Sequence, residues 1–156
     1  CFYGDNGLMN TERLDVHDVA ARQLTVIGLR YTSNRRALIE ALEDATAPLS
    51  IPDLMRAMPT ASQSSIYRNL TDLTNAGVVV RVQGTDEWAR FELDDAITGR
   101  HHHHIMCESC GEVLDIDIPE VLEHQLDTNL AELAEKSGYK ITHHRLDLVG
   151  RCSNCQ

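Results

Sequence analysis

Residues 101–111, with the sequence HHHHIMCESCG, place four consecutive histidines directly before a Cys-x-x-Cys pair. A second pair of this spacing stands at residues 152–155. Four thiolates form the closed tetrahedral shell that structural zinc prefers. Because no secretion signal is evident, zinc is favoured over disulfides, the other alternative being four unligated thiols in a reducing cell. The predicted structural zinc ligands are Cys107, Cys110, Cys152 and Cys155.

The histidine run has a second property if the chain there is extended. Side chains alternate along a strand, so His102 and His104 would face one side, and His101 and His103 the other. Two separate metal sites are therefore possible, although imidazole alone does not select among divalent metals. An affinity-tag remnant or a solvated polar run is the alternative. The short, internal run beside a zinc knuckle favours ligands.

Carboxylates and further histidines must complete these shells. Each such residue alone is more often a surface residue, so the prediction rests on several of them converging near the histidines. The candidates are Glu92 at the end of a predicted strand, Asp115 after the knuckle, the helix face of Glu120, Glu123, His124 and Asp127, and His143 and His144 on a predicted last strand.

The pattern before the histidines predicts a winged helix-turn-helix over residues 11–93, within an α+β protein. Its alternative is a generic small α+β domain. Residues 1–10 are interpreted as a tail or cloning remnant, and Cys1 is given no role. Apolar periodicity and caps predict helices over 11–29, 33–44, 50–58 and 62–75, then an alternating hairpin with strands 78–83 and 88–93.

A linker and metal-binding hinge is expected over residues 94–104. Residues 105–156 follow as a small α/β unit with strands 105–107 and 113–118, a helix over 119–136 and a strand over 140–149. No apolar run reaches membrane length, so we expect no membrane partner and a cytoplasmic location.

Charge is distributed unevenly around a net value of −10. Residues 1–90 carry nine Arg and no Lys against eleven acidic residues, and residues 91–156 carry five basic against thirteen acidic residues. The acidic total argues against nonspecific coating of nucleic acid, but a local Arg patch suits specific contacts. No hydrolase or phosphate-loop motif is present, so we expect no enzyme; a metalloenzyme or a zinc-stabilised interaction module is the alternative from another class.

DNA contacts would come from the helix over 62–75, whose first residues would enter the major groove. Packing or solvated-face roles are the alternatives for the same side chains. The predicted contacts are Ser64, Ser65, Tyr67 and Arg68 on this helix, with Arg30, Tyr31 and Arg35 beside the helix over 33–44.

Several segments together resemble the ferric uptake regulator family of metal-responsive repressors. They are GLRYTSNR at 28–35, SIYRNL at 65–70, RFEL at 90–93, the run at 101–111 and HHRLDLVGRC at 143–152. The likeness spans about residues 20–156. It implies a winged-helix domain, a C-terminal dimerisation domain, binding of palindromic operator DNA as a homodimer, and repression that depends on metal.

The resemblance also implies three metal sites. One is the structural Zn²⁺ at the cysteines. A regulatory site for Fe²⁺, Zn²⁺ or Mn²⁺ maps to Glu92, His102, His104 and Asp115, of which Asp115 matches a carboxylate of peroxide-sensing members. An additional site maps to His101, His103, His144 and a helix carboxylate, for which Glu123 is preferred over Asp127 and Glu120.

Two departures from the family pattern concern the regulatory metal. Pro48 stands where many members have a loop histidine, and His17 is a speculative substitute ligand. The histidine run is similar to that of zinc uptake regulators, yet those carry a cysteine at the position of Glu92, where peroxide sensors tend to carry aspartate. A peroxide-sensing repressor is the alternative within the family, although Glu92 argues against it.

Overall fold

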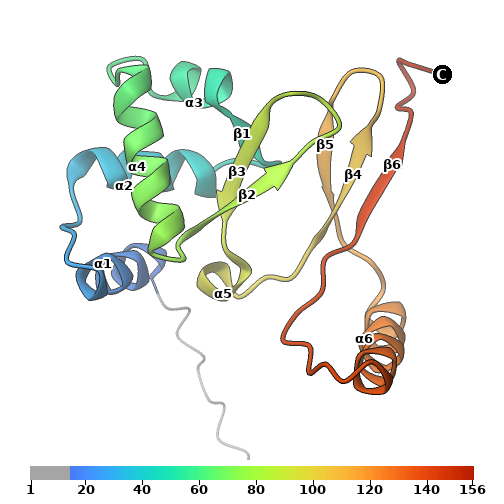
Figure 1. Cartoon of the computed structure of the whole chain (residues 1–156). Helices are drawn as coiled ribbons and strands as arrows, with labels where there is room; N and C mark the ends of the chain where they lie inside the picture. The colour runs from blue at the N-terminus through green and yellow to red at the C-terminus, as the bar shows by residue number, and fades with distance from the viewer. Residues whose placement is uncertain (1–14) are drawn as a thin grey trace, which may run out of the picture.

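The computed structural model describes residues 15–156, so the predicted tail and Cys1 lie outside the described residues. Two groups of elements follow one another along the chain, each built around its own three-stranded sheet (Figure 1). Mixed helix and sheet confirms the predicted α+β class. None of the described helices is long and apolar enough to cross a membrane.

Four of the described helices form the first group, and side-chain caps define where they begin. They are α1 (Val16–Val26), α2 (Ser33–Glu43), α3 (Ile51–Ala57) and α4 (Gln63–Asn75). Thr32 and Ser62 accept hydrogen bonds from the backbone of the first turns of α2 and α4. Ser50 and Asp53 form a reciprocal capping box on α3. These predicted helix starts are confirmed.

The first sheet closes the helical group with the predicted hairpin. Its strands are β1 (Leu49–Ser50), β2 (Val79–Gln83) and β3 (Ala89–Leu93), in the order β1-β3-β2 and all antiparallel. The two-residue β1 was not predicted, because it is too short to show alternation. Leu24, Leu38, Leu70 and Val78 belong to the buried core between helices and sheet.

The second sheet has the order β5-β4-β6, from strands β4 (His103–Cys107), β5 (Val113–Ile116) and β6 (Asp147–Gly150). β4 pairs antiparallel with β5 and parallel with β6. It begins two residues before the predicted start at 105, because His103 and His104 pair with Ile116 and Asp115. The prediction of a last strand over 140–149 was wrong at its start: only β6 pairs, and residues 143–146 precede it as irregular chain.

Helix α6 (Glu120–Lys136) joins β5 to the irregular segment before β6 and has no buried residue. The predicted linker contains a short helix that periodicity could not reveal, α5 (Asp95–Thr98). Asp94 caps α5, and Gly99 ends it with a positive φ of 66°. Buried Ile97 anchors α5 to the protein interior. The hinge is therefore ordered immediately before the histidines.

The hairpin of β2 and β3 packs against the cysteine knuckle of the second half (Figure 1). Val82 is buried with Met106 and Val113, and Thr85 Oγ1 donates to the Cys107 carbonyl at 2.8 Å. Arg90 donates to the Gly111 carbonyl at 2.6 Å. A Cβ at Gly111 (φ 72°) would also clash with the Asp86 carboxylate. Glycine thus permits both the left-handed backbone and the close approach of the wing.

Candidate metal centres and nucleic-acid interface

The structure brings together the four predicted cysteines at one end of the second sheet, because the parallel strands β4 and β6 each end beside one Cys-x-x-Cys pair. We call Cys107, Cys110, Cys152 and Cys155 the cysteine cluster; their sulfur atoms all lie within 4.8 Å of one another. Cys110 Sγ and Cys152 Sγ are 3.7 Å apart. A tetrahedral zinc with Zn–S bonds of about 2.3 Å has sulfur–sulfur edges of about 3.8 Å. The cluster has the size of a zinc shell.

The protonation of these thiols also fits a metal. Backbone N–H groups, first that of Cys152, lower the pKa of the Cys107 thiol to about 6. Neighbouring thiols, first Cys152, raise the pKa of Cys155 to about 12. The Cys107 thiolate therefore forms readily, whereas hydrogen bonds with neighbouring thiols keep Cys155 protonated. A divalent cation would hold all four deprotonated.

A second group of candidate ligands joins the two halves. Glu92, His102, His104 and Asp115, the Glu92 cluster, offer ligand atoms within 4.8 Å of one another. Glu92 Oε2 lies 3.2 Å from His102 Nε2 and 3.0 Å from His104 Nε2. Asp115 Oδ1 is 3.8 Å from His104 Nε2. Because Glu92 extends from β3 and His104 from β4, the cluster spans the hinge between the sheets.

Electrostatics in this cluster follows from burial and pairing. Burial alone would raise the pKa of Glu92 and lower that of His104. Their mutual hydrogen bond and charge outweigh burial, so the pKa of Glu92 is lowered and that of His104 is raised. Burial also raises the pKa of the Asp115 carboxyl. The pairing of Glu92 with His104 therefore favours the charged form of both side chains.

A cleft beside the Glu92 cluster opens between the halves. Its lining includes Glu43 of α2, Ile97 of α5 and the side chains of Glu92, His102 and Asp115. His17, the speculative substitute ligand, does not belong to any of the three groups within residues 15–156. Its Nδ1 is hydrogen-bonded to the Tyr31 hydroxyl, and its Nε2 lies 4.0 Å from Glu43. The cleft gives an ion or small solute a route to the cluster from the side of α2.

A third group occupies the opposite face of the histidine run. His101, His103, Glu123 and His144 form the Glu123 cluster, again with ligand atoms within 4.8 Å of one another. Glu123 lies 2.8 Å from His103 Nε2, 3.3 Å from His101 Nε2 and 3.1 Å from His144 Nε2. Among the helix carboxylates left open by the sequence, Glu123 thus meets three imidazoles. Asp127 instead contacts the other ring nitrogen of His144, with its Oδ1 3.1 Å from Nδ1. Glu120 does not belong to any of the three groups of candidate ligands among the described residues.

One buried atom supports a metal at the Glu123 cluster. His144 Nε2 has no hydrogen-bond partner among the described residues, because its approach to Glu123 lacks hydrogen-bond geometry. An unpaired buried polar atom is costly, and a cation would satisfy it. Carboxylates also stand behind the ligands: Asp127 behind His144, and Asp147, which is hydrogen-bonded at 3.3 Å to His104 Nδ1. Such outer carboxylates are typical of histidine metal sites.

Sequence reasoning missed two outer carboxylates: Asp147, and Asp95, whose Oδ1 lies 3.2 Å from His102 Nδ1. Their roles depend on which ring nitrogen they meet in the folded chain, and no spacing in the sequence shows that. His143 is exposed, with its Nδ1 on Thr142, and does not join His144 in the cluster. The fold thus separates the adjacent pair 143–144 into one candidate ligand and one surface residue.

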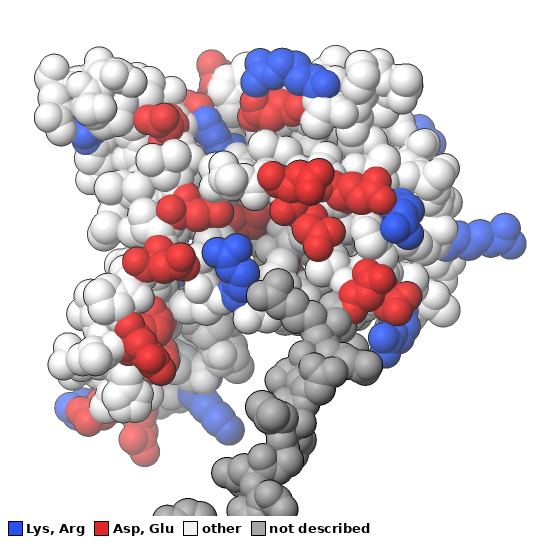
Figure 2. Space-filling view, turned by 180° about the vertical axis from the view of Figure 1, so that it is seen from behind, with Lys and Arg blue, Asp and Glu red and all other residues white. Residues whose placement is uncertain are grey.

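The candidate nucleic-acid interface is the exposed start of α4, which crosses in front of α2 (Figure 1). Ser64, Tyr67 and Arg68 are exposed there, and Tyr67 retains 48% of its accessible surface. Ser65 is half-buried, and its backbone N–H donates to Ser62. The face turned away from the viewer in Figure 1 carries acidic side chains over both halves (Figure 2). DNA phosphates would be repelled by the acidic side chains of that face.

The other three predicted contacts lie around the start of α2. Arg30 is exposed and Tyr31 half-buried. Arg35 is buried: its guanidinium donates to the Arg30 carbonyl and pairs with Asp72 of α4. The structure therefore does not bring Arg35 to the surface with the others. In this conformation, Arg35 holds α2 against α4.

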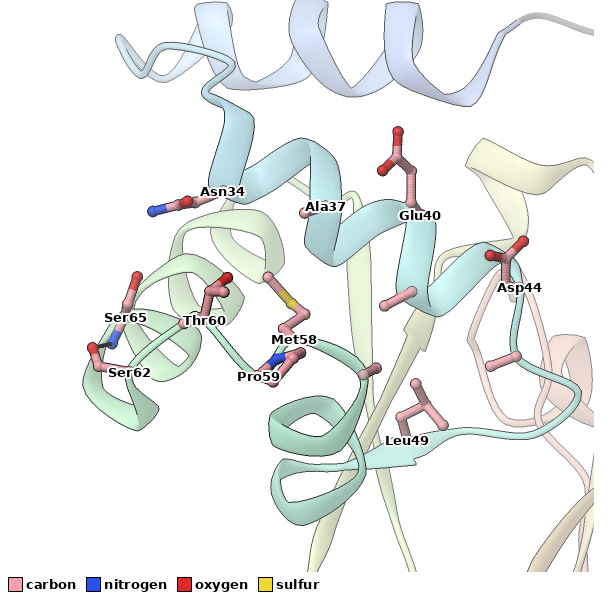
Figure 3. A pocket seen from close by; sticks show the side chains of 14 residues that line it. Asn34, Ala37, Glu40, Asp44, Leu49, Met58, Pro59, Thr60, Ser62 and Ser65 are labelled. Carbon is pink, nitrogen blue, oxygen red and sulfur yellow. Dashed lines mark hydrogen bonds between the residues drawn. The ribbon is translucent and has the colours of Figure 1, made fainter.

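A separate hollow adjoins this interface, between α2, β1 and the segment leading into α4 (Figure 3). Glu40, Asp44, Met58, Ser62 and Ser65 are among its lining residues. Its described lining contains neither histidine nor cysteine, so it does not offer a fourth metal centre of the same kind.

Comparisons with known proteins find similarity in both sequence and fold. A sequence model described as "Ferric uptake regulator family" matches residues 26–149. The chain is 33% identical over 140 residues to the peroxide operon regulator of Bacillus subtilis, with 87% of this chain and 90% of the relative covered. It is 35% identical over 139 residues to the ferric uptake regulation protein of Neisseria meningitidis, with 86% and 91% covered. The solved ferric uptake regulator of Vibrio cholerae superposes with a TM-score of 0.66 at 29% identity, covering 84% of this chain and 98% of that one.

The raised pKa of His104 predicts how metal binding at the Glu92 cluster depends on pH. A metal needs neutral imidazole, and Glu92 makes His104 hold its proton to higher pH than an isolated imidazole, with its pKa of about 6.5. As the pH decreases below the pKa of His104, we expect the affinity of the Glu92 cluster for Co²⁺ to fall about tenfold per pH unit. Absorption titrations between about pH 6 and pH 8 measure this. Asp147 also raises the pKa of His104, so Asp147→Asn should shift the loss of Co²⁺ affinity to lower pH. A Co²⁺ affinity that does not change with pH would contradict the prediction.

Proposed function

The chain belongs to the ferric uptake regulator family of metal-responsive transcriptional repressors, and we propose that it binds palindromic operator DNA as a homodimer when a divalent metal occupies the Glu92 cluster. The observation that carries this proposal is that the candidate ligands of the Glu92 cluster come from both halves of the chain. Glu92 belongs to the winged-helix half, whereas His104 and Asp115 belong to the second sheet. Occupancy of such a site is linked to the angle between the halves.

The proposed switch uses only this chain's residues. With the site filled, Glu92 is drawn to His102 and His104, which fixes β3 against β4. Because α4 packs on the sheet that contains β3, the two recognition helices of a dimer then take a defined spacing. A ligand changes this equilibrium only by its preference for one conformer. A preference of about 100-fold corresponds to about 2.7 kcal/mol of coupling.

The other two clusters take supporting roles in the proposal. The cysteine cluster holds structural Zn²⁺, since its four ligands leave no open position. The Glu123 cluster holds an additional divalent metal, with three imidazoles and one carboxylate. For the Glu92 cluster, the mixed imidazole and carboxylate donors suit Fe²⁺, Zn²⁺ or Mn²⁺.

A second copy of the chain is the proposed partner of the second half. Several apolar side chains of α6, β6 and the segment between them are exposed in the single chain, among them Val121, Leu133, Tyr139 and Val149. Their burial between two copies would join the second halves and leave each α4 free for one half of a palindrome. Access to operator DNA implies a cytoplasmic location.

Glu92→Gln tests the regulatory role. The amide keeps the shape but loses the charge that completes the Glu92 cluster. We expect metal-dependent affinity for a palindromic duplex, selected in vitro with the parental protein, to fall about 100-fold in anisotropy titrations. The cysteine zinc, measured by elemental analysis, should remain.

Glu87→Gln is the matched control, because Glu87 lies in the wing loop outside all three clusters. It should bind the same duplex as the parental protein does. Unchanged metal-dependent binding by Glu92→Gln would contradict the proposed regulatory site.

Arg68→Ala tests the recognition helix. Loss of one base-edge contact from Arg typically costs about 1–3 kcal/mol. We expect affinity for the selected duplex to fall accordingly, with less discrimination at one base pair of each half-site. Arg22→Ala removes an exposed arginine of α1 as the control. Equal effects of the two substitutions would place the interface elsewhere.

A peroxide-sensing repressor is the second candidate, favoured by the 33% identity to the peroxide operon regulator of Bacillus subtilis. Here iron bound at the Glu92 cluster would lead to oxidation of His102 or His104 and release of DNA. Mass spectrometry of the Fe²⁺-loaded protein after peroxide should then show one added oxygen on either residue. If both histidines remain unmodified and DNA binding still depends on metal, the peroxide-sensing candidate is contradicted and the metal-dependent repressor remains.

A further inference from the structure

Asp95 contacts one histidine of each histidine cluster. Its Oδ2 is hydrogen-bonded at 2.9 Å to His101 Nδ1, and its Oδ1 lies 3.2 Å from His102 Nδ1. The Nε2 atoms of the same two rings point the other way, to Glu123 at 3.3 Å and to Glu92 at 3.2 Å. Each oxygen of one carboxylate therefore stands behind a candidate ligand of a different metal site.

A cavity between the two clusters has this carboxylate in its wall. Asp95 lines it together with His101 and His144 from the Glu123 cluster and His102 and His104 from the Glu92 cluster. Residues of both clusters therefore line the same cavity.

The local structure of α5 directs Asp95 to this place. Asp94, the preceding carboxylate, accepts a hydrogen bond from the Ala96 backbone at 2.8 Å and so serves as the helix cap. Ile97 buries the helix on its other side. With Asp94 committed to the cap and Ile97 to the interior, Asp95 is the acidic residue of the hinge that reaches both imidazoles.

We propose that Asp95 is a positioning residue that couples the two histidine clusters, so that filling the Glu123 cluster tightens metal binding at the Glu92 cluster. This inference rests on the proposed binding of divalent metal at both clusters. It assigns a function to the hinge helix α5, although none of the candidate metal ligands belongs to α5.

The physical reason is the choice of ring tautomer. A metal bound through Nε2 of His101 requires the proton on Nδ1, where Asp95 Oδ2 accepts it. Metal binding makes that N–H a stronger donor, which holds the carboxylate and α5 in place. The second oxygen is then already aligned with His102 Nδ1, which favours the tautomer that presents Nε2 to the Glu92 cluster. The first metal that binds orders Asp95, so the second metal no longer has to overcome this loss of conformational entropy. Metal binding at the two clusters is therefore positively cooperative.

Two other carboxylates provide matched controls, because each supports a single cluster. Asp147 contacts only His104 Nδ1 of the Glu92 cluster, and Asp127 contacts only His144 Nδ1 of the Glu123 cluster. Substitution of an outer carboxylate typically weakens metal binding about 10–100-fold. Aspartate to asparagine at these positions therefore separates an effect on one site from an effect on both.

The experiment titrates Co²⁺ into the full chain with its cysteine zinc retained, and follows the visible absorption bands of each cluster against a competing chelator. Glu123→Gln blocks its own cluster. In the parental chain we expect the Glu92 cluster to bind Co²⁺ about tenfold more tightly than in Glu123→Gln. Asp95→Asn should lower the Co²⁺ affinity of both clusters about tenfold. In the Asp95→Asn chain, Glu123→Gln should cause no further change in the Co²⁺ affinity of the Glu92 cluster.

Asp147→Asn and Asp127→Asn should each weaken one cluster and keep the coupling. If Asp95→Asn weakens one cluster only, or if Glu123→Gln still affects the Glu92 cluster in the Asp95→Asn chain, the coupling role is overturned while the metal sites stand. If the parental chain takes up no Co²⁺ at either histidine cluster, the proposed function fails and this inference fails with it.

Discussion

The alternation of side chains along an extended backbone is the constraint on which both histidine clusters depend. His103 and His104 begin β4, so their side chains point to opposite faces and cannot meet on one ion; His101 and His102 directly precede the strand and join the same two faces. The chain must therefore divide them, with His102 and His104 on the side of β3 and His101 and His103 on the side of α6. Glu92 and Glu123 each complete one side. A shift by one residue in the register of β4 would exchange the two ligand sets.

The second half contains little apolar interior of its own. Its buried apolar cluster consists of Met106 and Val113 with Val82 of the wing, and α6 contributes no buried residue. Ordering of a residue costs about 1–2 kcal/mol of backbone entropy, which so few buried side chains do not offset for this half. Its order must come from other sources. Two candidate sources are metal at the cysteine cluster, which would tie β6 to β4, and the proposed second copy of the chain against the exposed apolar side chains.

The sequence predicted those features that local rules determine. Ser50, Thr32 and Ser62 identified helix starts because capping is local, and the cysteine spacing predicted four sulfur atoms that the fold indeed brings together. Features that depend on tertiary placement were missed. The pairing of β1 needs only two residues, and the contacts of Asp95 and Asp147 follow from where α5 and β6 meet the imidazoles. The burial of Arg35 likewise depends on Asp72, far along the chain.

The three clusters differ in how far occupancy can influence the DNA-binding half. All four ligands of the cysteine cluster belong to the second half, so zinc there reaches the DNA-binding half only through contacts of the knuckle with the hairpin, such as that of Thr85 with the Cys107 carbonyl. The Glu92 cluster has one ligand on β3, and its occupancy is therefore linked directly to the position of the wing. The Glu123 cluster is intermediate. Its ligands lie at the hinge and beyond, but Asp95 extends its influence to α5 and to His102. Regulation should therefore be strongest at the cluster whose ligands come from both sheets, and graded at the one that reaches the hinge through a shared carboxylate.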